Sequence, residues 1–357
     1  MRIEELKNFL IHPDATVVDA MQKIDKNAKG ILFVVDDKER LCGSLTDGDV
    51  RRWLIKTGNM YSFVENLMNK SPKFLYSNNV KKYREYLQKH EIRVAPVVTP
   101  DNVVCDIVFL EGEYHEEKTH QGALTDVPVV IMAGGKGTRL YPYTKVLPKP
   151  LIPIGDIPIM ERIIDRFRDF GVKEFWATVN YKKGMIKSYF GDVVTDYDLF
   201  YVEEDRPLGT AGSLHLIEED FDKPIIVTNC DILIQADYAD VYRYHKKTGN
   251  ALTIVTALKN IVVPYGVVHS KEQGRITGME EKPKLSYFVN TGMYVLNPEI
   301  LKAIPKDTFF HMTDVADMLL KQNRPVGMYP ISEDSFLDMG EFEEMHRMEQ
   351  KLDLKSE

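Results

Sequence analysis

The feature that most constrains the fold of this 357-residue chain is an apolar run that ends in a glycine-rich turn. Residues 127–132, "VPVVIM", have the composition of a strand buried on both faces, and "AGGKGTRL" follows directly. Such strands occur in parallel or mixed sheets with helices on both sides, where ligands bind beyond the carboxyl ends of the strands. The turn therefore predicts an anion-binding site at the edge of an α/β sheet.

The sequence after this turn alternates between strand and helix patterns. Apolar residues at helical spacing predict a helix over residues 159–170, which Gly171 would end, and a shorter helix over 185–191. Further apolar runs predict strands over residues 174–180, 224–231, 251–258 and 292–297. This alternation favours one sheet, parallel or mixed, with helices on both faces.

The glycine turn fits neither of the two common phosphate-binding templates. A Walker loop has Lys and then Ser or Thr after its last glycine, but Thr138 and Arg139 follow Gly137 here. A dinucleotide-binding turn needs a small residue where Leu140 stands, and Pro142 prevents an early helix. The sequence therefore predicts a phosphate site of another kind.

What remains is a nest of backbone amides flanked by two cations. Small residues let the backbone approach an anion, and successive N–H groups can surround it. Arg139 adds a forked donor suited to phosphate, and Lys149 stands on a segment stiffened by Pro148 and Pro150. The alternative interpretation is a tight turn with two surface cations.

The N-terminal part contains a loose internal repeat. The order helix, strand, turn, strand occurs over residues 16–45 and again over residues 79–110, and a further helix begins at Thr46. Residues 110–126 are polar and lack periodicity, as is typical of a linker. We therefore predict an N-terminal region over residues 1–118, a linker over 119–126 and a second domain over 127–357.

Composition excludes several other classes of protein. The net charge of -8 argues against a nucleic-acid-binding surface, and no apolar run reaches the length of a membrane span. The cysteines at 42, 105 and 230 show no C-x-x-C spacing, which makes a zinc site or a disulfide framework unexpected. The first residues lack a secretory apolar core. We expect a cytoplasmic protein that binds neither nucleic acid nor membranes.

The turn and the segment after it carry a resemblance to a known family. "AGGKGTRLYPYTKVLPKPLIPI" resembles the signature of the sugar-1-phosphate nucleotidylyltransferases, which is G-G-x-G-T-R-L-x-P-x-T followed by P-K-P. The resemblance covers residues 127–357 and implies an α/β fold with a Rossmann-like, mixed but mostly parallel sheet. It implies that two segments bind the nucleotide, through Ala133, Gly134, Gly135, Gly137, Thr138, Arg139, Gly209 and Thr210.

The resemblance also implies roles for charged residues that lie far apart in the sequence. Asp231 and Asp338 would bind Mg²⁺, the expected cofactor, and would form the catalytic set with Arg139 and Lys149. The residues implied to bind the sugar phosphate are Gly266, Glu281, Lys282 and Asn290. Without the resemblance, Asp231 is a turn cap and "EEKPK" is a solvated turn.

The N-terminal region resembles a pair of CBS domains, which form an α+β unit. "LCGSLTDGDVRRWL" fits the CBS element G-x-[IVL]-[ST]-x-x-D-[ILV], and residues 64–110 resemble the second module without its Ser/Thr-x-x-Asp. The resemblance implies that Thr46 and Asp49 contact a regulatory nucleotide, and that one nucleotide binds per pair. Such pairs commonly self-associate, so a homo-oligomer is expected. The alternative is a dimerisation platform without a ligand.

The implied reaction is attack by a sugar-1-phosphate oxygen on the α-phosphorus of a nucleoside triphosphate, with release of pyrophosphate. Chains that join these two regions resemble guanylyltransferases that act on glucosamine 1-phosphate, which favours GTP and that sugar. Mannose, glucose, N-acetylglucosamine and heptose phosphates remain open, as do UTP, CTP and dTTP. A different class also remains, a nucleotide-sensing regulatory protein with an inactive transferase domain.

Overall fold

The chain forms two compact units that do not follow the sequence in order. The computed structural model describes residues 3–27, 29–77, 82–110, 122–193, 195–340 and 342–352. The first unit is Met1–His115 with Asn260–Tyr287, and the second is Glu116–Lys259 with Phe288–Glu357. The grouping of residues 260–287 with the first unit differs from the predicted boundaries, because this segment lies inside the second domain in sequence.

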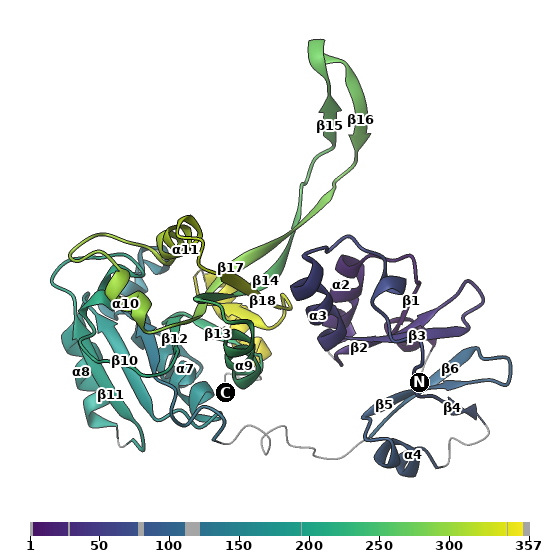
Figure 1. Cartoon of the computed structure of the whole chain (residues 1–357), viewed down its shortest axis with the longest axis horizontal. Helices are drawn as coiled ribbons and strands as arrows, with labels where there is room; N and C mark the ends of the chain where they lie inside the picture. Colours follow the sequence, from purple (N-terminus) through teal and green to yellow (C-terminus); the bar gives the residue numbers. More distant parts are fainter. Residues whose placement is uncertain are drawn as a thin grey trace. The chain divides into compact units, whose positions relative to one another are not determined.

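The second unit is built on a seven-stranded sheet with the order β11-β10-β7-β12-β17-β14-β18 (Figure 1). Its strands are β7 (Val129–Met132), β10 (Glu174–Val179), β11 (Asp198–Glu203), β12 (Ile225–Asn229), β14 (Leu252–Val262), β17 (Lys284–Leu296) and β18 (Val326–Ile331). The pairs β11–β10, β10–β7, β7–β12 and β14–β18 are parallel, and β12–β17 is antiparallel. The predicted mixed, mostly parallel sheet is therefore confirmed.

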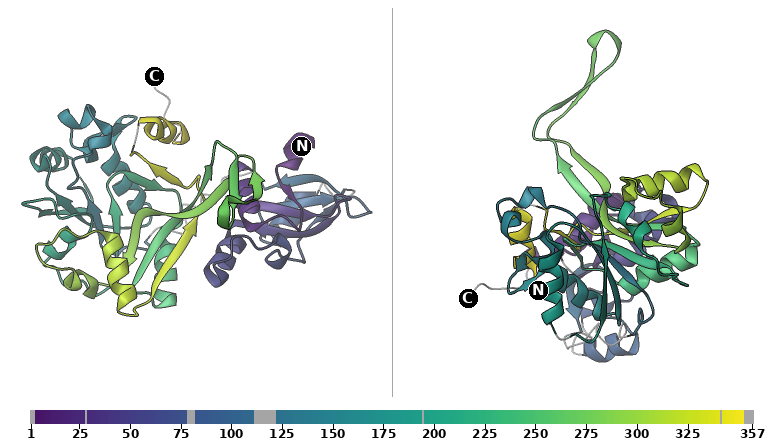
Figure 2. Two further views of the ribbon diagram at one scale, coloured as in Figure 1. Left: turned by 90° about the horizontal axis from the view of Figure 1, so that it is seen from above. Right: turned by 90° about the vertical axis from the view of Figure 1, so that its left-hand side faces the viewer.

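Alternate residues of the central strand β7 face two separate hydrophobic cores. Val129 and Ile131 belong to the core that includes residues of α7 (Ile159–Arg168), α8 (Lys183–Asp192), α9 (Tyr238–Thr248) and α12 (Phe342–Lys351). Val130 and Met132 belong to the core that includes residues of η5 (Gly212–Leu216), α10 (Glu299–Ala303) and α11 (Met312–Lys321). Helices thus cover both faces of the sheet (Figures 1 and 2).

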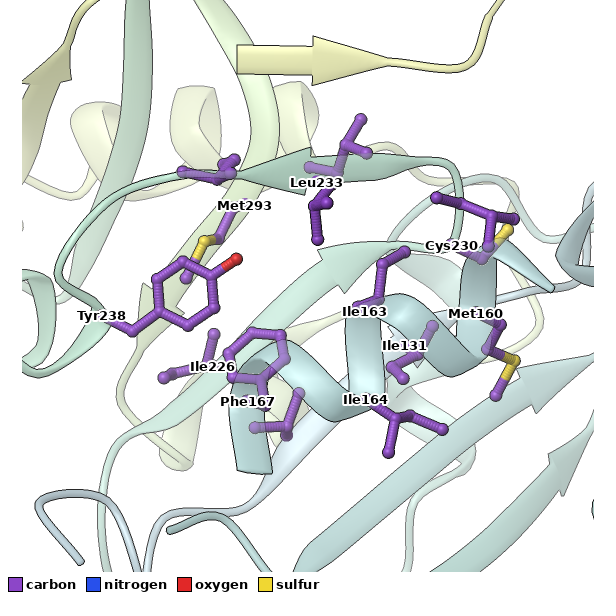
Figure 3. Packing of buried hydrophobic residues seen from close by; sticks show 14 of the residues in the cluster. Ile131, Met160, Ile163, Ile164, Phe167, Ile226, Cys230, Leu233, Tyr238 and Met293 are labelled. Carbon is purple, nitrogen blue, oxygen red and sulfur yellow. The ribbon is translucent and has the colours of Figure 1, made fainter. Parts of the chain in front are cut away.

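Helix α7 shows how the apolar spacing becomes packing. Ile163, Ile164 and Phe167 recur at helical intervals and are buried. Figure 3 shows them against Ile131 of β7 and Tyr238 of α9, and the rings of Phe167 and Tyr238 lie 4.6 Å apart. The helix predicted over residues 159–170 is confirmed, with its end at Arg168.

The first unit contains two three-stranded sheets with the same topology. One is β1 (Leu10–Ile11), β2 (Ile31–Val35) and β3 (Leu41–Thr46), and the other is β4 (Leu75–Tyr76), β5 (Val94–Val98) and β6 (Val104–Phe109). In each, the first pair is parallel and the second antiparallel. Among the described residues up to Leu110, its helices include α1 (Ile3–Lys7), α2 (Val17–Asn27), α3 (Asp47–Thr57), η1 (Val64–Asn66) and α4 (Tyr83–Lys89). The strands β1 and β4, of two residues each, were too short to leave a pattern in the sequence.

The second copy of the repeat begins with a pattern that predicts a helix over residues 79–90. Residues 79–81 lie outside the described residues, and helix α4 covers Tyr83–Lys89 of this range. The structure also differs in part from the linker predicted over residues 119–126. Residues 119–121 lie outside the described residues, but Leu124 is 1% exposed and its N–H donates to the Phe170 carbonyl at 2.9 Å. Leu124 therefore fixes the end of the predicted linker to the second unit.

An antiparallel hairpin that the sequence analysis did not predict joins β14 to β17 along the chain. It consists of β15 (Val267–Ser270), η6 (Glu272–Gly274) and β16 (Ile276–Glu280), drawn in green in Figure 2. Asn260, which precedes it, accepts hydrogen bonds from Gln22 of α2 at 3.0 Å and from Ser286 at 2.7 Å. These contacts lie within the first unit.

In the described part of the chain, no helix combines the length and apolarity needed to cross a membrane.

Candidate active site

The glycine turn directly follows β7 and is closed by a left-handed glycine. Gly137 has φ 63°, and a Cβ atom there would lie 2.8 Å from Thr144 Cγ2 and 3.1 Å from Lys149 Cβ. Only glycine allows both this backbone conformation and this approach. The chain then continues through η3 (Thr138–Leu140), α6 (Tyr143–Val146) and η4 (Lys149–Leu151). The turn therefore lies directly against Lys149.

A cavity of about 350 Å³ lies at the carboxyl edge of the parallel strands. The strands β7, β10, β11 and β12 are parallel neighbours, and the cavity includes residues at or just after the ends of all four. Its walls are formed by Met132, Gly134, Gly135, Gly137, Thr138, Arg139, Leu140, Lys149, Thr178, Glu204, Pro207, Leu208, Gly209, Thr210, Asn229, Cys230, Asp231 and Phe309. The structure therefore brings both predicted nucleotide-binding segments to one cavity, together with Lys149 and Asp231.

Lys149 and Asp231, which both line the cavity, form a buried ion pair. The ammonium group donates to Asp231 Oδ2, and both residues are 9% exposed. Burial of either charge alone would carry a large desolvation cost, and the partner offsets it. The two residues are 82 positions apart in the sequence. The sequence analysis identified both residues but not their pairing.

Asp338 reaches Asp231 through the pairing of two short strands. In β13 (Ile232–Ile234) and β19 (Phe336–Asp338), Ile232 lies opposite Asp338, and the Met339 N–H donates to the Asp231 carbonyl at 2.8 Å. Burial raises the pKa of the Asp338 carboxyl, and the charge of Asp231 adds to this, whereas Lys149 and Arg139 act in the opposite direction. The predicted pair of aspartates is thus assembled at one place.

One carboxylate oxygen of Asp338 has no hydrogen-bond partner among the described residues. This oxygen, Asp338 Oδ1, is buried. A Cβ atom on Gly340 would lie 3.1 Å from both this oxygen and Arg139 Nη1, so Arg139 is close as well. The described residues contain no cluster of three or more His, Cys, Asp or Glu side chains that could bind a metal ion. Any cation here would take its remaining ligands from a substrate or from water.

Glu204 is a cavity residue that the sequence analysis did not identify. It is 5% exposed, its Oε2 accepts from the Leu208 N–H at 3.2 Å, and a Cβ atom on Gly134 would collide with its Oε1. Burial raises the pKa of the Glu204 carboxyl, while hydrogen bonds from Leu208 and Ser213 act in the opposite direction. Its position directly after a strand was the available signal, because β11 ends at Glu203.

Two predicted residues have local structural contacts outside this cavity. Ala133 is 1% exposed, and its N–H donates to the Thr178 carbonyl at 2.9 Å. Asn290, in β17, donates to Tyr294 Oη at 2.7 Å and accepts from the Gly292 N–H at 2.9 Å. Neither side chain lines the cavity.

The other predicted sugar-phosphate residues lie together in the first unit. A Cβ atom on Gly266 would lie 3.1 Å from Glu281 Oε2, and Lys282 Nζ lies 4.0 Å from Glu281 Oε1. Glu281 and Lys282 directly follow β16, and their side chains are 77% and 63% exposed. Glu281 and Lys282 are neighbours in the sequence, and none of these three residues lines the cavity of the second unit.

Thr46 and Asp49 form a capping box at the start of α3. Asp49 Oδ2 accepts from the Thr46 N–H at 2.9 Å and from its hydroxyl at 2.6 Å, and Thr46 Oγ1 accepts from the Asp49 N–H at 3.2 Å. Asp49 Oδ1 also accepts from Arg52. These bonds give both residues a role in the fold of the first unit.

Comparisons with known families place the site in context. The profile of the nucleotidyl transferase family matches residues 128–354, and that of the CBS domain matches residues 3–56. Among solved structures, HddC from Yersinia pseudotuberculosis is similar with a TM-score of 0.51 and 26% identity, covering 63% of this chain and 99% of that chain.

Two curated relatives show the range of names in the family. A UTP–glucose-1-phosphate uridylyltransferase of Synechocystis sp. is 34% identical over 195 residues, which are 49% of this chain and 50% of the relative. A mannose-1-phosphate guanyltransferase of Emericella nidulans is 36% identical over 184 residues, with shares of 49% and 50%. The chain thus spans about half the length of these relatives.

Proposed function

Because this chain belongs to the nucleotidyl transferase family, we propose that it transfers a nucleoside monophosphate from a nucleoside triphosphate to a sugar 1-phosphate. A sugar-phosphate oxygen attacks the α-phosphorus, the bond from this phosphorus to the β-bridging oxygen breaks, and pyrophosphate leaves with the electron pair. The supporting observation is the convergence of Arg139, Lys149 and Asp231 beside a turn of backbone amides, with Asp338 next to Asp231.

The site suits a reaction between two anions that repel each other. The attacking phosphate oxygen is already negatively charged at neutral pH, so the reaction needs no general base. The turn amides and Arg139 would hold the β- and γ-phosphates, and Lys149 would offset the charge that gathers where the two substrates meet. Because Lys149 already contacts Asp231, its ammonium group is held in a fixed position before substrate binds.

We propose Mg²⁺ as the cofactor, held by Asp231 and Asp338. Mg²⁺ is usually bound through one or two carboxylates together with substrate phosphates and water. The unpartnered, buried Oδ1 of Asp338 and the adjacent Asp231 carboxylate fit this donor set. The bound ion would supply charge neutralisation at the phosphates and the leaving group.

GTP is the proposed nucleotide, and Glu204 is the residue that supports it. A carboxylate accepts hydrogen bonds only, and guanine presents two adjacent donors, N1–H and the 2-amino group. Uracil and thymine present a single N–H between two carbonyl groups, which a carboxylate would repel. Glu204 is 5% exposed and lines the cavity beside Gly134, so its carboxylate is placed to meet the edge of a base.

Replacing Glu204 with Gln tests this assignment of the base. The amide keeps the shape of the side chain and loses both its charge and half of its acceptor capacity. We expect kcat/KM for GTP to fall by about tenfold or more, because charge-assisted hydrogen bonds are the stronger ones, and kcat/KM for UTP to stay within about twofold or rise. An equal loss for both nucleotides would contradict the assignment.

For the acceptor we propose glucosamine 1-phosphate. The resemblance assigns the sugar phosphate to Glu281 and Lys282, and a carboxylate suits a positively charged amino group whereas an ammonium group suits a phosphate. Both residues belong to the first unit and do not line the cavity, so the support for this acceptor is the resemblance. Mannose and glucose 1-phosphates are the main competitors, since mannose and glucose occur in the names of the relatives. Comparing the three acceptors with wild-type protein and with Glu281→Gln separates these cases, because loss of the carboxylate should penalise the amino sugar most.

For the first unit we propose a second CBS-type module in addition to the one that the CBS profile matches. We also propose that this unit binds a regulatory nucleotide. The two sheets share one topology, and a cavity of about 860 Å³ lies among Lys70, Lys73, Lys89, Phe74 and Tyr76, where cations and rings suit phosphate and base. AMP, ATP or GDP should raise the melting temperature or change turnover. The double variant Lys73→Ala, Lys89→Ala should abolish this response to nucleotide, whereas Asp49→Ala should abolish it only if the nucleotide binds at α3. No response to any nucleotide would instead favour a first unit that serves self-association without a ligand.

The decisive experiment measures pyrophosphate release over a panel of nucleoside triphosphates and sugar phosphates with Mg²⁺. Asp231→Asn should lower turnover by about a hundredfold or more. Asp317→Asn, an exposed aspartate on α11, is the matched control and should leave turnover unchanged. If no pair of substrates releases pyrophosphate, the proposed transferase activity is wrong, and the alternative of a nucleotide-sensing protein is favoured.

A further inference from the structure

Phe309 is an aromatic residue that lines the nucleotide cavity while most of its side chain stays exposed. The side chain is 61% exposed, whereas Leu140 and Leu208, which line the same cavity, are 1% and 4% exposed. An exposed ring is common on a protein surface and has no meaning by itself. The way in which the chain holds this ring is what points to a role.

The segment that carries Phe309 is fixed to the second nucleotide-binding segment by backbone hydrogen bonds. The Phe310 N–H donates to the Leu208 carbonyl at 2.9 Å. In return, the Phe310 carbonyl accepts from the N–H groups of Ala211 at 2.9 Å and Gly212 at 3.0 Å. The Met312 N–H donates to Thr210 Oγ1 at 3.0 Å. About a hundred residues of chain separate the two segments, so this docking is a built feature of the tertiary structure.

The glycines of the nucleotide-binding segment make this docking possible. Gly209 has φ 82°, and a Cβ atom there would lie 2.5 Å from the Phe310 carbonyl oxygen. A Cβ atom on Gly212 would lie 2.5 Å from the Thr308 carbonyl oxygen. Substitution of either glycine would push the segment that carries Phe309 away from the cavity.

The ring itself is held at a defined angle. It packs edge-on against His311, with ring centroids 4.8 Å apart and an interplanar angle of 84°. His311 is the residue before α11, and its N–H donates to Asp314 Oδ2 at 2.7 Å. Phe309 is therefore oriented by a neighbour that is itself anchored to a helix.

Resting on the proposed function, we propose that Phe309 stacks on the base of the bound nucleoside triphosphate and covers the base end of the cavity. Leu208 links the two elements involved, because its N–H contacts Glu204 and its carbonyl contacts Phe310. The edge of the base would then be recognised by Glu204 and its face by Phe309. The phosphates would lie beside Arg139 and Lys149, which line the same cavity.

Equilibrium binding to the full chain tests this role without relying on turnover. We compare the dissociation constants of GTP and of inorganic triphosphate for wild type, Phe309→Ala, Phe309→Trp and Leu320→Ala. Leu320, on α11, is 56% exposed and does not line the cavity, so it controls for loss of an exposed apolar group. Loss of stacking on one base should weaken GTP by about 5- to 150-fold in Phe309→Ala.

In the same experiment, the dissociation constant of triphosphate for Phe309→Ala should stay within about twofold of the wild-type value, since triphosphate has no base to stack. Phe309→Trp should retain GTP binding, and Leu320→Ala should bind both ligands as wild type does. GTP binding by Phe309→Ala within twofold of wild type would overturn the inference, and so would an equal loss for triphosphate. Wild-type protein that binds GTP but releases no pyrophosphate with any acceptor would instead refute the proposed function alone.

Discussion

At the scale of single residues, the candidate site contains charged groups that are largely buried, where they lose contact with water. Lys149 and Asp231 are buried together, and Asp338 adds a second carboxylate beside the first. Buried charged groups of this kind are typical of functional sites. Binding of a charged ligand can offset the free energy that their burial costs. This arrangement predicts that some substitutions here will stabilise the protein and inactivate it.

Asp338→Asn should raise the melting temperature at neutral pH while it abolishes most of the turnover. Burial and Asp231 raise the pKa of the Asp338 carboxyl above 3.8, so the folded state favours its neutral form. This contribution to stability is present below pH 3.8 and is lost as the pH rises through the raised pKa. The melting temperature of the variant should therefore gain over that of wild type as the pH rises from 3.8 through the raised pKa, and the gain should persist at pH 8. A lower melting temperature of the variant at pH 8 would contradict the prediction.

His245 should make stability fall in mild acid. Its ring is 1% exposed and lies between Thr253 Oγ1 at 2.9 Å and Asn297 Oδ1 at 3.1 Å, and burial lowers its pKa below 6.5. A depressed pKa means that the stabilising contribution is complete above pH 6.5 and is lost progressively as the pH falls below that value.

Denaturant titration from pH 8 to pH 5 measures this effect of His245. His245→Gln should cost roughly 1–3 kcal/mol at pH 8, because buried hydrogen-bonding partners lose their contact, and should show a weaker dependence on pH. His346→Gln, whose side chain is 71% exposed in wild type, is the control and should behave as wild type does. Identical pH profiles for wild type and His245→Gln would exclude His245 as the source.

At the scale of elements, the turn after β7 depends on the backbone of Gly137. Gly137→Ala should destabilise the chain by roughly 1–3 kcal/mol, because a left-handed conformation and contact with Thr144 both oppose a Cβ atom. The same change should weaken nucleotide binding, since Lys149 packs against the turn. Urea unfolding and GTP titration measure the two effects.

Gly191→Ala is the matched control for this element. Gly191 lies in α8, and a Cβ atom there would meet no other atom within 4 Å. Alanine favours helical conformation, so this variant should be more stable by roughly 0.5–1 kcal/mol with unchanged nucleotide binding. Similar losses in both variants would show that Gly137 has no special conformational role.

At the scale of the whole molecule, the two units have separate hydrophobic cores. Buried residues of the first unit form their own clusters, for example around Phe33 and around Leu87, and those of the second unit surround its central sheet. Calorimetry should therefore resolve two unfolding transitions. GTP with Mg²⁺ should raise the midpoint temperature of only the transition that belongs to the second unit. At a GTP concentration of a hundred times the dissociation constant, the free energy of unfolding of this unit should rise by about 2.7 kcal/mol. A single transition that shifts as a whole would show that the units unfold together.

The sequence by itself determined much of the local structure and predicted many residues of the candidate site. Apolar periodicity predicted β7, α7 and the strands β10, β12 and β14, because burial on one or two faces leaves a regular pattern along the chain. The spacing of glycines and cations after β7 indicated an anion site. The resemblance to a known family supplied Asp231 and Asp338, which no spacing in the sequence could connect.

Only the tertiary structure decided which of these residues meet. The pairing of Lys149 with Asp231, the approach of Asp338 through β13 and β19, and the docking of Phe310 onto Leu208 join segments that are far apart in the chain. Such contacts follow from strand order and register, which local patterns do not encode. The same reason explains why the sequence analysis did not identify Phe309 or the grouping of residues 260–287 with the first unit.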